Sequence, residues 1–323
     1  MSKKRIMITG SGGFLASNFI RQMIYNKHYN RLYDIVSIDR VSEASILNSI
    51  YSNKNHEFYI ADITDEHIVN IIMEATRPDI VLHMAAYTSV DESIKDPSNY
   101  VLNNVYGTQV IINASIKWKV KKFIYTSTDE IYGQLNNENE PAWTELSPPT
   151  PRNPYSASKL AGEYLVKAAG STYGLDYYIT RCSNIYGTRQ THNKLIPRTI
   201  KSILDNEPII VYGKGNNIRS WIYTSDVCSA IIKIIEDGQN SEIYNISSNQ
   251  EYSNIEVVQM ICNAMDSGYS LIKHIEDPRP GHDFRYALDA SKLKMLGWEP
   301  KVKFKDGIKQ TVDWYQANRY LFR

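Results

Sequence analysis

A glycine-rich turn near the start of the chain constrains its fold more than any other feature. A short apolar run at residues 6–8 is followed directly by Thr-Gly-Ser-Gly-Gly-Phe-Leu-Ala at residues 9–16. Gly10 allows a tight turn, Gly13 lets the backbone approach a pyrophosphate, and Ala16 lets a helix pack closely on a strand. The first turn of such a helix directs unpaired N–H groups at phosphates. The pattern therefore predicts a strand, a turn and a helix that bind a dinucleotide.

Other short apolar runs predict a parallel sheet. They span residues 5–9, 34–39, 79–83, 121–126 and 176–181, and they do not alternate strictly between apolar and polar residues. Strands that are buried on both faces have this pattern, and helical crossovers bury parallel strands in this way. We expect an α/β fold, a Rossmann-like doubly wound parallel sheet with a smaller mixed C-terminal substrate domain.

The domain organisation follows from where this regularity ends. We expect residues 1–184 to form the dinucleotide-binding domain and residues 185–323 to form mainly the substrate domain. A helical pattern at residues 225–235 suggests that the chain returns to the first domain in a segment near residues 225–246. Residues 134–154 contain five prolines among polar residues. Such a segment cannot form a regular element, so we expect a surface loop that borders the active site.

Composition excludes several classes of partner. A formal net charge of +1 provides no field that would recruit nucleic acid or an anionic membrane, so an anionic ligand must be bound by local positive groups. No apolar stretch reaches the length of a membrane span. Cys182, Cys228 and Cys262 lie far apart, which indicates reduced thiols in a cytoplasmic compartment rather than disulfides. The seven histidines are scattered, so we expect no bound metal.

Asp39 indicates which dinucleotide binds. It ends the second predicted strand, where a carboxylate can accept hydrogen bonds from both ribose hydroxyls. A 2′-phosphate would be disfavoured there, so NAD is expected, although the adjacent Arg40 leaves NADP open. Asp62 and Ile63 would follow a third strand that precedes the apolar run at residues 79–83. Asp62 could contact the adenine or cap a helix.

Tyr155 and Lys159 form a Tyr-x-x-x-Lys pair. Asn153 and Pro154 are a favourable cap and first residue for a helix, on which Tyr155 and Lys159 would share one face. A lysine cation favours the phenolate, so Tyr155 could act as a base near neutral pH. The pair also arises by chance in a chain with 24 tyrosines, and its position after a dinucleotide-binding half favours catalysis.

A second motif follows the fourth of these apolar runs. Thr128, Asp129 and Glu130 come directly after it, at the edge where doubly wound sheets form their ligand crevice. Neighbouring carboxylates repel, so one can stay protonated while the other is ionised. The pair therefore suits one acid and one base in a single active site, although an Asp-Glu pair is more often a solvated turn.

With these motifs in place, the chain resembles the nucleoside-diphosphate-glucose 4,6-dehydratases, an NAD-dependent family of extended short-chain dehydrogenases/reductases. The resemblance covers nearly the whole chain. It includes the segments Arg181–Gly187, Lys194–Pro197, Pro208–Tyr212, Asn217–Trp221 and Arg279–Asp283, in that order. It implies that the enzyme converts dTDP-glucose or UDP-glucose to the 4-keto-6-deoxy sugar nucleotide plus water, in deoxysugar biosynthesis of the rhamnose type.

The resemblance also implies roles for five catalytic residues. Tyr155 would take the proton from the sugar O4 while hydride leaves C4 for NAD, and Lys159 would bind the nicotinamide ribose. Glu130 would remove the C5 proton while Asp129 protonates the departing C6 hydroxyl. Hydride would then return to C6, and Thr128 would hydrogen-bond the O4 region.

Binding residues are implied in the same way. For the cofactor they are Gly10, Gly13, Phe14, Leu15, Asp39, Asp62, Ile63, Ala85, Ala86, Asn104, Tyr155 and Lys159. For the substrate they are Thr128, Asn184, Lys194, Leu195, Tyr212, Arg219, Asn254, Arg279 and His282. Arginine suits bidentate contacts with a diphosphate, whereas each arginine alone is more often a surface or ion-pair residue.

The chain departs from the family pattern after the third apolar run. Bacterial dTDP-sugar enzymes usually carry Glu-Ser-His-Val-Asp where this chain has Tyr87, Thr88, Ser89, Val90 and Asp91. Thr88 resembles the eukaryotic enzymes that act on UDP-glucose, whereas the segment at residues 279–283 resembles the bacterial ones. The sequence therefore leaves the nucleotide open between dTDP and UDP.

Two other kinds of function share part of the pattern. Sugar-nucleotide 4-epimerases and UDP-glucuronate decarboxylases share the Rossmann domain and Tyr-x-x-x-Lys but lack the Asp-Glu pair after threonine. A catalytically silent NAD-binding protein would usually lose the tyrosine, the lysine or both. The family also implies a homodimer through the helices expected at residues 104–117 and 155–172.

Overall fold

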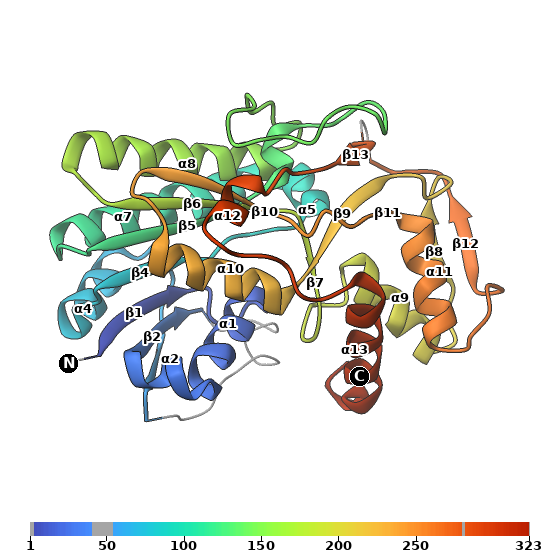
Figure 1. The fold of residues 1–323 in the computed structure, drawn as a ribbon, viewed down its shortest axis with the longest axis horizontal. Helices are drawn as coiled ribbons and strands as arrows, with labels where there is room; N and C mark the ends of the chain where they lie inside the picture. The colour runs from blue at the N-terminus through green and yellow to red at the C-terminus, as the bar shows by residue number, and fades with distance from the viewer. Residues whose placement is uncertain (1–2, 41–53, 280–281, 323) are drawn as a thin grey trace.

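The central element of the fold is a parallel sheet. The computed structural model describes residues 3–40, 54–279 and 282–322 (Figure 1). Within these residues, seven parallel strands pair in the order β10-β6-β5-β4-β1-β2-β3. The strands are β1 Lys4–Thr9, β2 Tyr33–Asp39, β3 His56–Ile60, β4 Ile80–His83, β5 Lys122–Thr128, β6 Tyr177–Cys182 and β10 Glu242–Ile246. This sheet confirms the predicted Rossmann-like, doubly wound α/β fold, and all five apolar runs lie on strands.

Helices cover both faces of the sheet because side chains alternate along each buried strand. Ile6 and Ile8 pack in one cluster with α1 (Phe14–Tyr25) and α10 (Thr224–Asp237). Met7 packs in a second cluster with α4 (Glu66–Thr76), α7 (Gly107–Lys117) and α8 (Pro154–Tyr173). In Figure 1, α10 crosses in front of the sheet, whereas α8 lies along the top of the view. The helices of this half are α1 Phe14–Tyr25, α2 Lys27–Leu32, α4 Glu66–Thr76, α5 Val90–Lys95, α6 Pro97–Tyr100, the π-helix η1 Val101–Tyr106, α7 Gly107–Lys117 and α8 Pro154–Tyr173.

The C-terminal half forms a smaller mixed unit, at the right of Figure 1. Its elements are β7 Asn184–Tyr186, α9 Leu195–Leu204, β8 Ile209–Tyr212, β9 Ile218–Tyr223, β11 Glu251–Ser253, α11 Asn254–Ala264, β12 Ile272–Ile275, β13 Arg285–Tyr286 and α13 Phe304–Ala317. The short helix α12 (Ser291–Met295) instead packs against the central sheet beside β10. The helix α10 (Thr224–Asp237) and β10 return to the central sheet, where β10 pairs with β6. A domain boundary at residue 184 stays a prediction.

The proline-rich segment at residues 134–154 forms no helix or strand before α8 begins at Pro154. Isolated bridges from Leu135 to Arg285 and from Trp143 to Leu288 hold it against the C-terminal half. Arg152 and Asn153, at its end, line a cleft. The prediction of a loop that borders the site is therefore confirmed. Pro280 and Gly281, which belong to a motif of the resemblance, lie outside the described residues.

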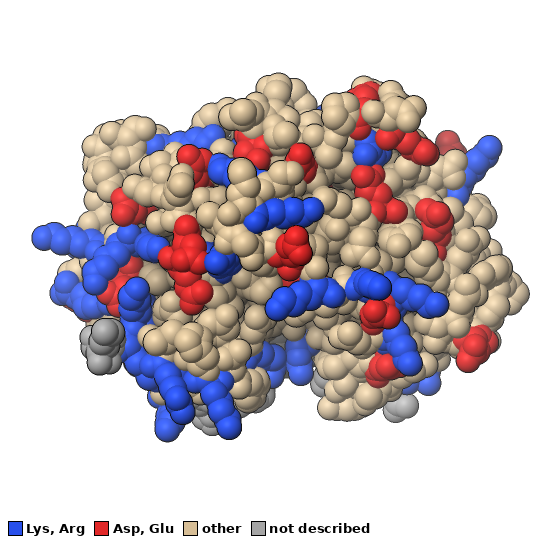
Figure 2. All heavy atoms as spheres, in the orientation of Figure 1, with Lys and Arg blue, Asp and Glu red and all other residues tan. Residues whose placement is uncertain are grey.

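The three cysteines are free and buried. Among the described residues, no group of histidine, cysteine and acidic side chains could hold a metal ion. No helix in those ranges has the length and apolar character needed to cross a membrane. On the face shown in Figure 2, basic and acidic side chains are interspersed.

Candidate active site

Two adjoining clefts lie beyond the carboxyl ends of the parallel strands. They have volumes of about 700 and 590 Å³. The first is lined mainly by residues that follow β1, β2, β3, β4 and β5, and the second mainly by α5 and the C-terminal half. Ser89, Glu130, Asn184 and Lys194 line both clefts, so the two form one continuous site.

The first cleft begins at the glycine turn. Gly10 has a φ of +72°, and a Cβ atom there would lie 2.7 Å from Cα of Ala85. The Gly12 N–H donates to Oδ2 of Asp39 at 2.6 Å, which fixes the turn against the end of β2. Gly13 caps α1 without a side-chain hydrogen bond, and the first turn of α1 contains no acidic residue. This helix terminus can therefore receive an anionic group, as a dinucleotide pyrophosphate requires.

Gly10→Ala should destabilise the chain by about 2–5 kcal/mol, because it combines left-handed backbone strain with overpacking against Ala85. Gly174→Ala is a matched control, since Gly174 has a φ of +71° but nothing lies within 4 Å of the Cβ position. That control should cost only about 1 kcal/mol. Thermal unfolding measures both at roughly 2–4 °C per kcal/mol. Equal losses in the two variants would show that the close approach to Ala85 is unimportant.

Polar side chains surround the far end of the first cleft. Burial raises the pKa of Asp39, and the hydrogen bond from Gly12 opposes that effect. The Arg40 guanidinium lies 4.6 Å from the Tyr87 ring centre, and its Nη1 lies 4.0 Å from Oδ2 of Asp62. Oδ1 of Asp62 accepts hydrogen bonds from Thr64. Asp65 caps α4 instead, so the helix-cap interpretation of Asp62 is wrong.

Asn104 differs from the other predicted cofactor residues, because it does not line the cleft. Its side chain accepts from Tyr87 N–H at 2.8 Å and donates to Tyr87 O at 3.0 Å and to Ser158 Oγ at 2.9 Å. Asn104 lies on the π-helix η1. Such helices are rare in proteins, and those that occur are often found at functional sites. Asn104 therefore joins the strand β4 side of the cleft to α8. The other predicted cofactor residues line the cleft: Gly10, Gly13, Phe14, Leu15, Asp39, Asp62, Ile63, Ala85, Ala86, Tyr155 and Lys159.

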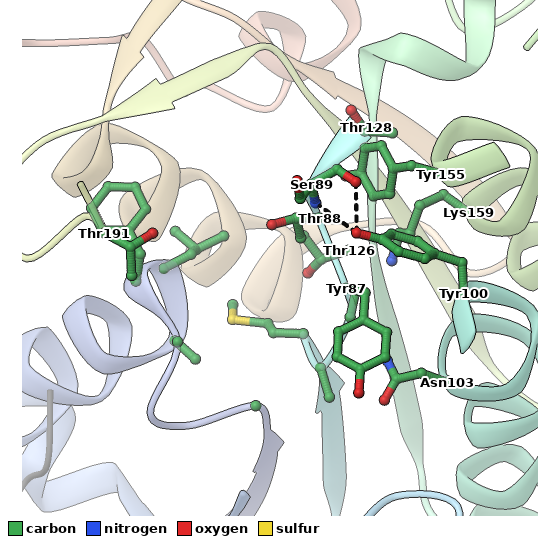
Figure 3. A pocket seen from close by; sticks show the side chains of 18 of the residues that line it. Tyr87, Thr88, Ser89, Tyr100, Asn103, Thr126, Thr128, Tyr155, Lys159 and Thr191 are labelled. Atoms are coloured by element: carbon green, nitrogen blue, oxygen red, sulfur yellow. Dashed lines mark hydrogen bonds between the residues drawn. The ribbon is translucent and has the colours of Figure 1, made fainter. Parts of the chain in front are cut away.

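The five predicted catalytic residues converge on the first cleft. Thr128 ends β5, and Asp129 and Glu130 begin the 3-10 helix η2 (Asp129–Tyr132). Tyr155 and Lys159 lie on α8 and face the same cavity (Figure 3). The structure therefore brings together two motifs that are more than twenty residues apart in the sequence.

Asn153 links the two catalytic segments. Its Oδ1 accepts from Ser156 N–H at 2.8 Å in the capping box of α8, and its Nδ2 donates to Oε2 of Glu130 at 3.1 Å. The predicted helix start at Asn153 and Pro154 is confirmed. One side chain thus caps the helix of Tyr155 and orients the carboxylate of Glu130.

Asp129 and Glu130 have different environments. Asp129 is 3% exposed, and burial, followed by the charge of Glu130, raises its pKa to about 8. Burial also raises the pKa of Glu130, whereas the hydrogen bond from Asn153 and the charges of Lys194 and Arg219 oppose that effect. Asp129 is therefore protonated at neutral pH, as a proton donor must be. Glu130 has donors and cations that stabilise its carboxylate form.

The environment of Tyr155 differs from the sequence prediction. Burial first, and then the charge of Glu130, holds the pKa of Tyr155 well above 10. Burial lowers the pKa of Lys159 to about 7, and its Nζ lies 4.2 Å from the Tyr125 ring centre. The prediction that Lys159 makes Tyr155 acidic is wrong for the protein alone, because both groups are desolvated and the lysine loses part of its charge.

A buried ion pair fixes the segment that carries the two acids. Arg181 on β6 contacts Glu163 on α8 through Nε–Oε1 at 3.1 Å and Nη2–Oε2 at 2.7 Å. Its Nη1 donates to the hydroxyl of Tyr132 at 2.7 Å. Arg181 and Glu163 are 2% and 0% exposed at their side chains. This contact holds η2 in register with the helix that carries Tyr155 and Lys159.

The second cleft contains the predicted substrate residues. Except for Thr128, which lines the first cleft, all of them line it: Asn184, Lys194, Leu195, Tyr212, Arg219, Asn254, Arg279 and His282. The Arg219 guanidinium lies 4.2 Å from the ring centre of Tyr286. Positive side chains thus gather in a cleft that opens beside Glu130.

Sequence reasoning missed several residues of this cleft. Arg152 lies 2.9 Å from Oδ1 of Asp283, whose other carboxylate oxygen accepts from the Tyr286 hydroxyl. Asp91 forms an ion pair with Arg279. Arg152 and Asp283 are 131 positions apart, and Asp91 and Arg279 are 188 positions apart, so no local spacing could have identified these two ion pairs.

Comparison with known proteins agrees with this geometry. The model of the family described as GDP-mannose 4,6 dehydratase matches residues 7–311. A dTDP-glucose 4,6-dehydratase from Xanthomonas campestris is 41% identical over 97% of this chain and 93% of its own length. The solved dTDP-glucose 4,6-dehydratase DesIV from Streptomyces venezuelae, which has NAD bound, superimposes with a TM-score of 0.92 at 34% identity and covers 98% of each chain.

The fold alone does not separate dehydratases from epimerases. The solved UDP-glucose 4-epimerase from Thermotoga maritima superimposes with a TM-score of 0.88 at 30% identity, covering 98% of this chain and 99% of that one. The Asp129–Glu130 pair in the cleft is the feature that sequence reasoning associates with dehydration. With a family match over most of its length and full-length dehydratase relatives, this chain belongs to the sugar-nucleotide 4,6-dehydratase family.

Proposed function

We propose that this protein is an NAD-dependent dTDP-glucose 4,6-dehydratase, which forms the 4-keto-6-deoxy sugar nucleotide and water. One observation carries the proposal: the buried Asp129 lies next to Glu130, where the dinucleotide cleft meets the basic second cleft. An epimerase has no use for an acid that expels the C6 hydroxyl. The names of the relatives favour dTDP-glucose, and UDP-glucose is the second candidate because Thr88 resembles the eukaryotic pattern.

The residues of the first cleft suit NAD. The glycine turn and the open N-terminus of α1 would hold the pyrophosphate, and Asp39 would accept from the adenosine ribose. Lys159 would hold the nicotinamide ribose. When bound there, NAD supplies the acceptor for the C4 hydride and returns that hydride to C6.

The chain's own groups would move the protons. Tyr155 accepts the O4 proton as C4 becomes a ketone, and Thr128 holds that oxygen. The ketone makes the C5 proton acidic, so Glu130 can remove it while Asp129 protonates the C6 hydroxyl, which leaves as water. Glu130 then returns its proton to C5. The sugar loses one water overall, and the proton that Tyr155 gains makes up, by exchange with solvent, for the proton that Asp129 gives.

The test is a mass measurement on the purified protein with NAD and, separately, dTDP-glucose and UDP-glucose. The proposal expects loss of one water from the product, no net reduction of NAD, and faster turnover of dTDP-glucose. An isomer of unchanged mass would instead support the epimerase. If neither sugar nucleotide reacts, the result would instead support the alternative of a catalytically silent NAD-binding protein.

We also propose a homodimer. The segments expected at the interface overlap η1 and α8. These two helices expose the large apolar side chains of Val101, Leu102, Tyr106 and Tyr164. Sedimentation equilibrium should give twice the mass of the chain, and Leu102→Lys should shift the protein toward the monomer. A wild-type monomer at micromolar concentration would reject the dimer. We further propose a cytoplasmic location and a place in rhamnose-type deoxysugar synthesis, supported by the free cysteines and by the family.

A further inference from the structure

The guanidinium of Arg279 forms an ion pair with a carboxylate of the same chain. Asp91, on α5, contacts Nε of Arg279 through Oδ1 at 2.6 Å and Nη2 through Oδ2 at 2.8 Å. The two residues are 188 positions apart and both line the second cleft. This two-point contact is the geometry that a guanidinium also offers to a phosphate.

The same carboxylate lies among the cations of the cleft. The pKa of Asp91 is lowered, first by the hydrogen bond from Arg279 and also by the charges of Lys194 and Arg198. Asp91 is therefore ionised at neutral pH. A diphosphate that approaches Arg279 in this cleft is therefore repelled by the negative charge of Asp91.

Other acids of the second cleft have different partners. Glu130 accepts from Asn153, and Asp283 contacts Arg152 and Tyr286. Glu92, the neighbour of Asp91, pairs with Lys95 at 3.0 Å on the same helix. Among the described residues of this cleft, Asp91 is thus the acid that is paired with a predicted diphosphate-binding arginine.

We propose that Asp91 sets the affinity for the nucleotide, because its carboxylate holds the two donors of Arg279 that the substrate diphosphate takes. Binding then proceeds by exchange: the diphosphate replaces the carboxylate on Arg279, and Asp91 is left to solvent. The exchange weakens binding of substrate and product alike, which favours release of the product. This inference rests on the proposed function, since it takes the ligand to be a nucleoside diphosphate sugar.

The test measures affinity for thymidine diphosphate by calorimetry on the NAD-loaded protein. Asp91→Asn keeps the size of the side chain and removes the charge, so thymidine diphosphate should bind about fivefold more tightly, the effect of one charge at about 4 Å in water. Thymidine, which has no phosphate, should bind unchanged. Weaker binding of thymidine diphosphate would overturn the proposal, because Asp91 would then orient Arg279 for the ligand.

A double-mutant cycle shows whether the effect passes through Arg279. In an Arg279→Met background, Asp91→Asn should change affinity for thymidine diphosphate by less than about twofold. A full fivefold gain there would overturn the exchange in favour of a general charge effect. Asp237→Asn is the matched charge control, because Asp237 pairs with Lys233 outside both clefts.

Inorganic pyrophosphate separates this inference from the identity of the nucleotide. If wild-type protein binds pyrophosphate but not thymidine diphosphate, the proposed nucleotide is wrong, and the fivefold gain of Asp91→Asn for pyrophosphate still tests the exchange. If wild-type protein binds both and the variant gains nothing, the proposed function stands and the exchange fails. Absence of binding to both probes in both proteins overturns the exchange as well.

Discussion

Replacing Asp129 by asparagine should reduce water loss from the sugar by about 10²–10⁴-fold, the usual contribution of a general acid. Burial and the neighbouring Glu130 raise the pKa of Asp129 to about 8, so the side chain carries a transferable proton at neutral pH. Asparagine has the same shape but no acidic proton. Product mass measures the loss directly. Oxidation at C4 does not need Asp129, so reduced nicotinamide should accumulate and be visible in its near-ultraviolet absorbance.

The same substitution should change how stability depends on pH. The pKa of Asp129 rises from 3.8 in the unfolded chain to about 8 in the folded one, so the folded state favours the neutral acid. This contribution to stability is fully present below pH 4 and is lost as pH rises through 8. Each unit of difference between the folded and unfolded pKa corresponds to about 1.4 kcal/mol. Ionising Asp129 in the folded protein therefore lowers stability by at most about 6 kcal/mol.

Asparagine cannot ionise, so Asp129→Asn should escape this cost. Its Tm should match that of the wild type below pH 4 and exceed it increasingly as pH rises to 8, by up to about 12–24 °C near pH 9, at roughly 2–4 °C per kcal/mol. Asp237→Asn, an exposed acid in an ion pair, should show no such trend. If the Tm difference stays constant with pH, Asp129 is not held protonated, and its assignment as the acid fails independently of any activity assay.

The sequence predicts the central sheet well because the inner strands are buried on both faces. β1, β4, β5 and β6 appear as apolar runs whose ends agree with the structure to about two residues. β3 gives no such run, since it is an edge strand with Phe58 and Ile60 exposed. β10 lies at the opposite edge, and its place depends on pairing with residues of β6 that are 64 positions earlier. Edge strands depend on distant partners rather than on their own pattern.

The candidate site divides in the same way. Residues that belong to local motifs, such as Gly10, Asp129 and Tyr155, were all expected in the cleft and line it. Asp91 and Asp283 belong to segments that are compared with the family pattern. Nothing in the spacing of those segments shows that Asp91 pairs with Arg279 or that Asp283 pairs with Arg152. The protonation state of Tyr155 is harder still to predict from the sequence, because its pKa depends on how deeply the side chain is buried, and no sequence motif gives that burial.

Tyr155→Phe should reduce turnover by about 10²–10⁴-fold, because it removes the group that accepts the O4 proton. The loss should appear in the first step, so no reduced nicotinamide should accumulate during turnover. This outcome distinguishes it from Asp129→Asn, in which oxidation precedes the block. Affinity for thymidine diphosphate should be unchanged, since that ligand lacks the sugar that Tyr155 contacts. Tyr155 is 7% exposed, and phenylalanine fills the same volume.

The matched control is Tyr244→Phe. Tyr244 is 1% exposed on β10, and its hydroxyl accepts from Gln239 N–H at 2.8 Å, outside both clefts. It should lose about 1 kcal/mol of stability and keep its activity. If Tyr155→Phe retains more than about a tenth of wild-type turnover, well short of the loss expected for a general base, another group accepts the O4 proton.

A titration of tyrosinate absorbance in the wild-type protein gives a further constraint on Tyr155. Since burial and Glu130 hold its pKa well above 10, the hydroxyl is protonated in the protein alone. A positive charge in the first cleft is needed to make it a base near neutral pH, and the nicotinamide cation supplies such a charge when NAD is bound. The alkaline absorbance of tyrosinate should therefore appear at lower pH with NAD than without it in wild-type protein. The same titration on Tyr155→Phe should show no change with NAD, and a change that persists there would assign the shifted tyrosine elsewhere.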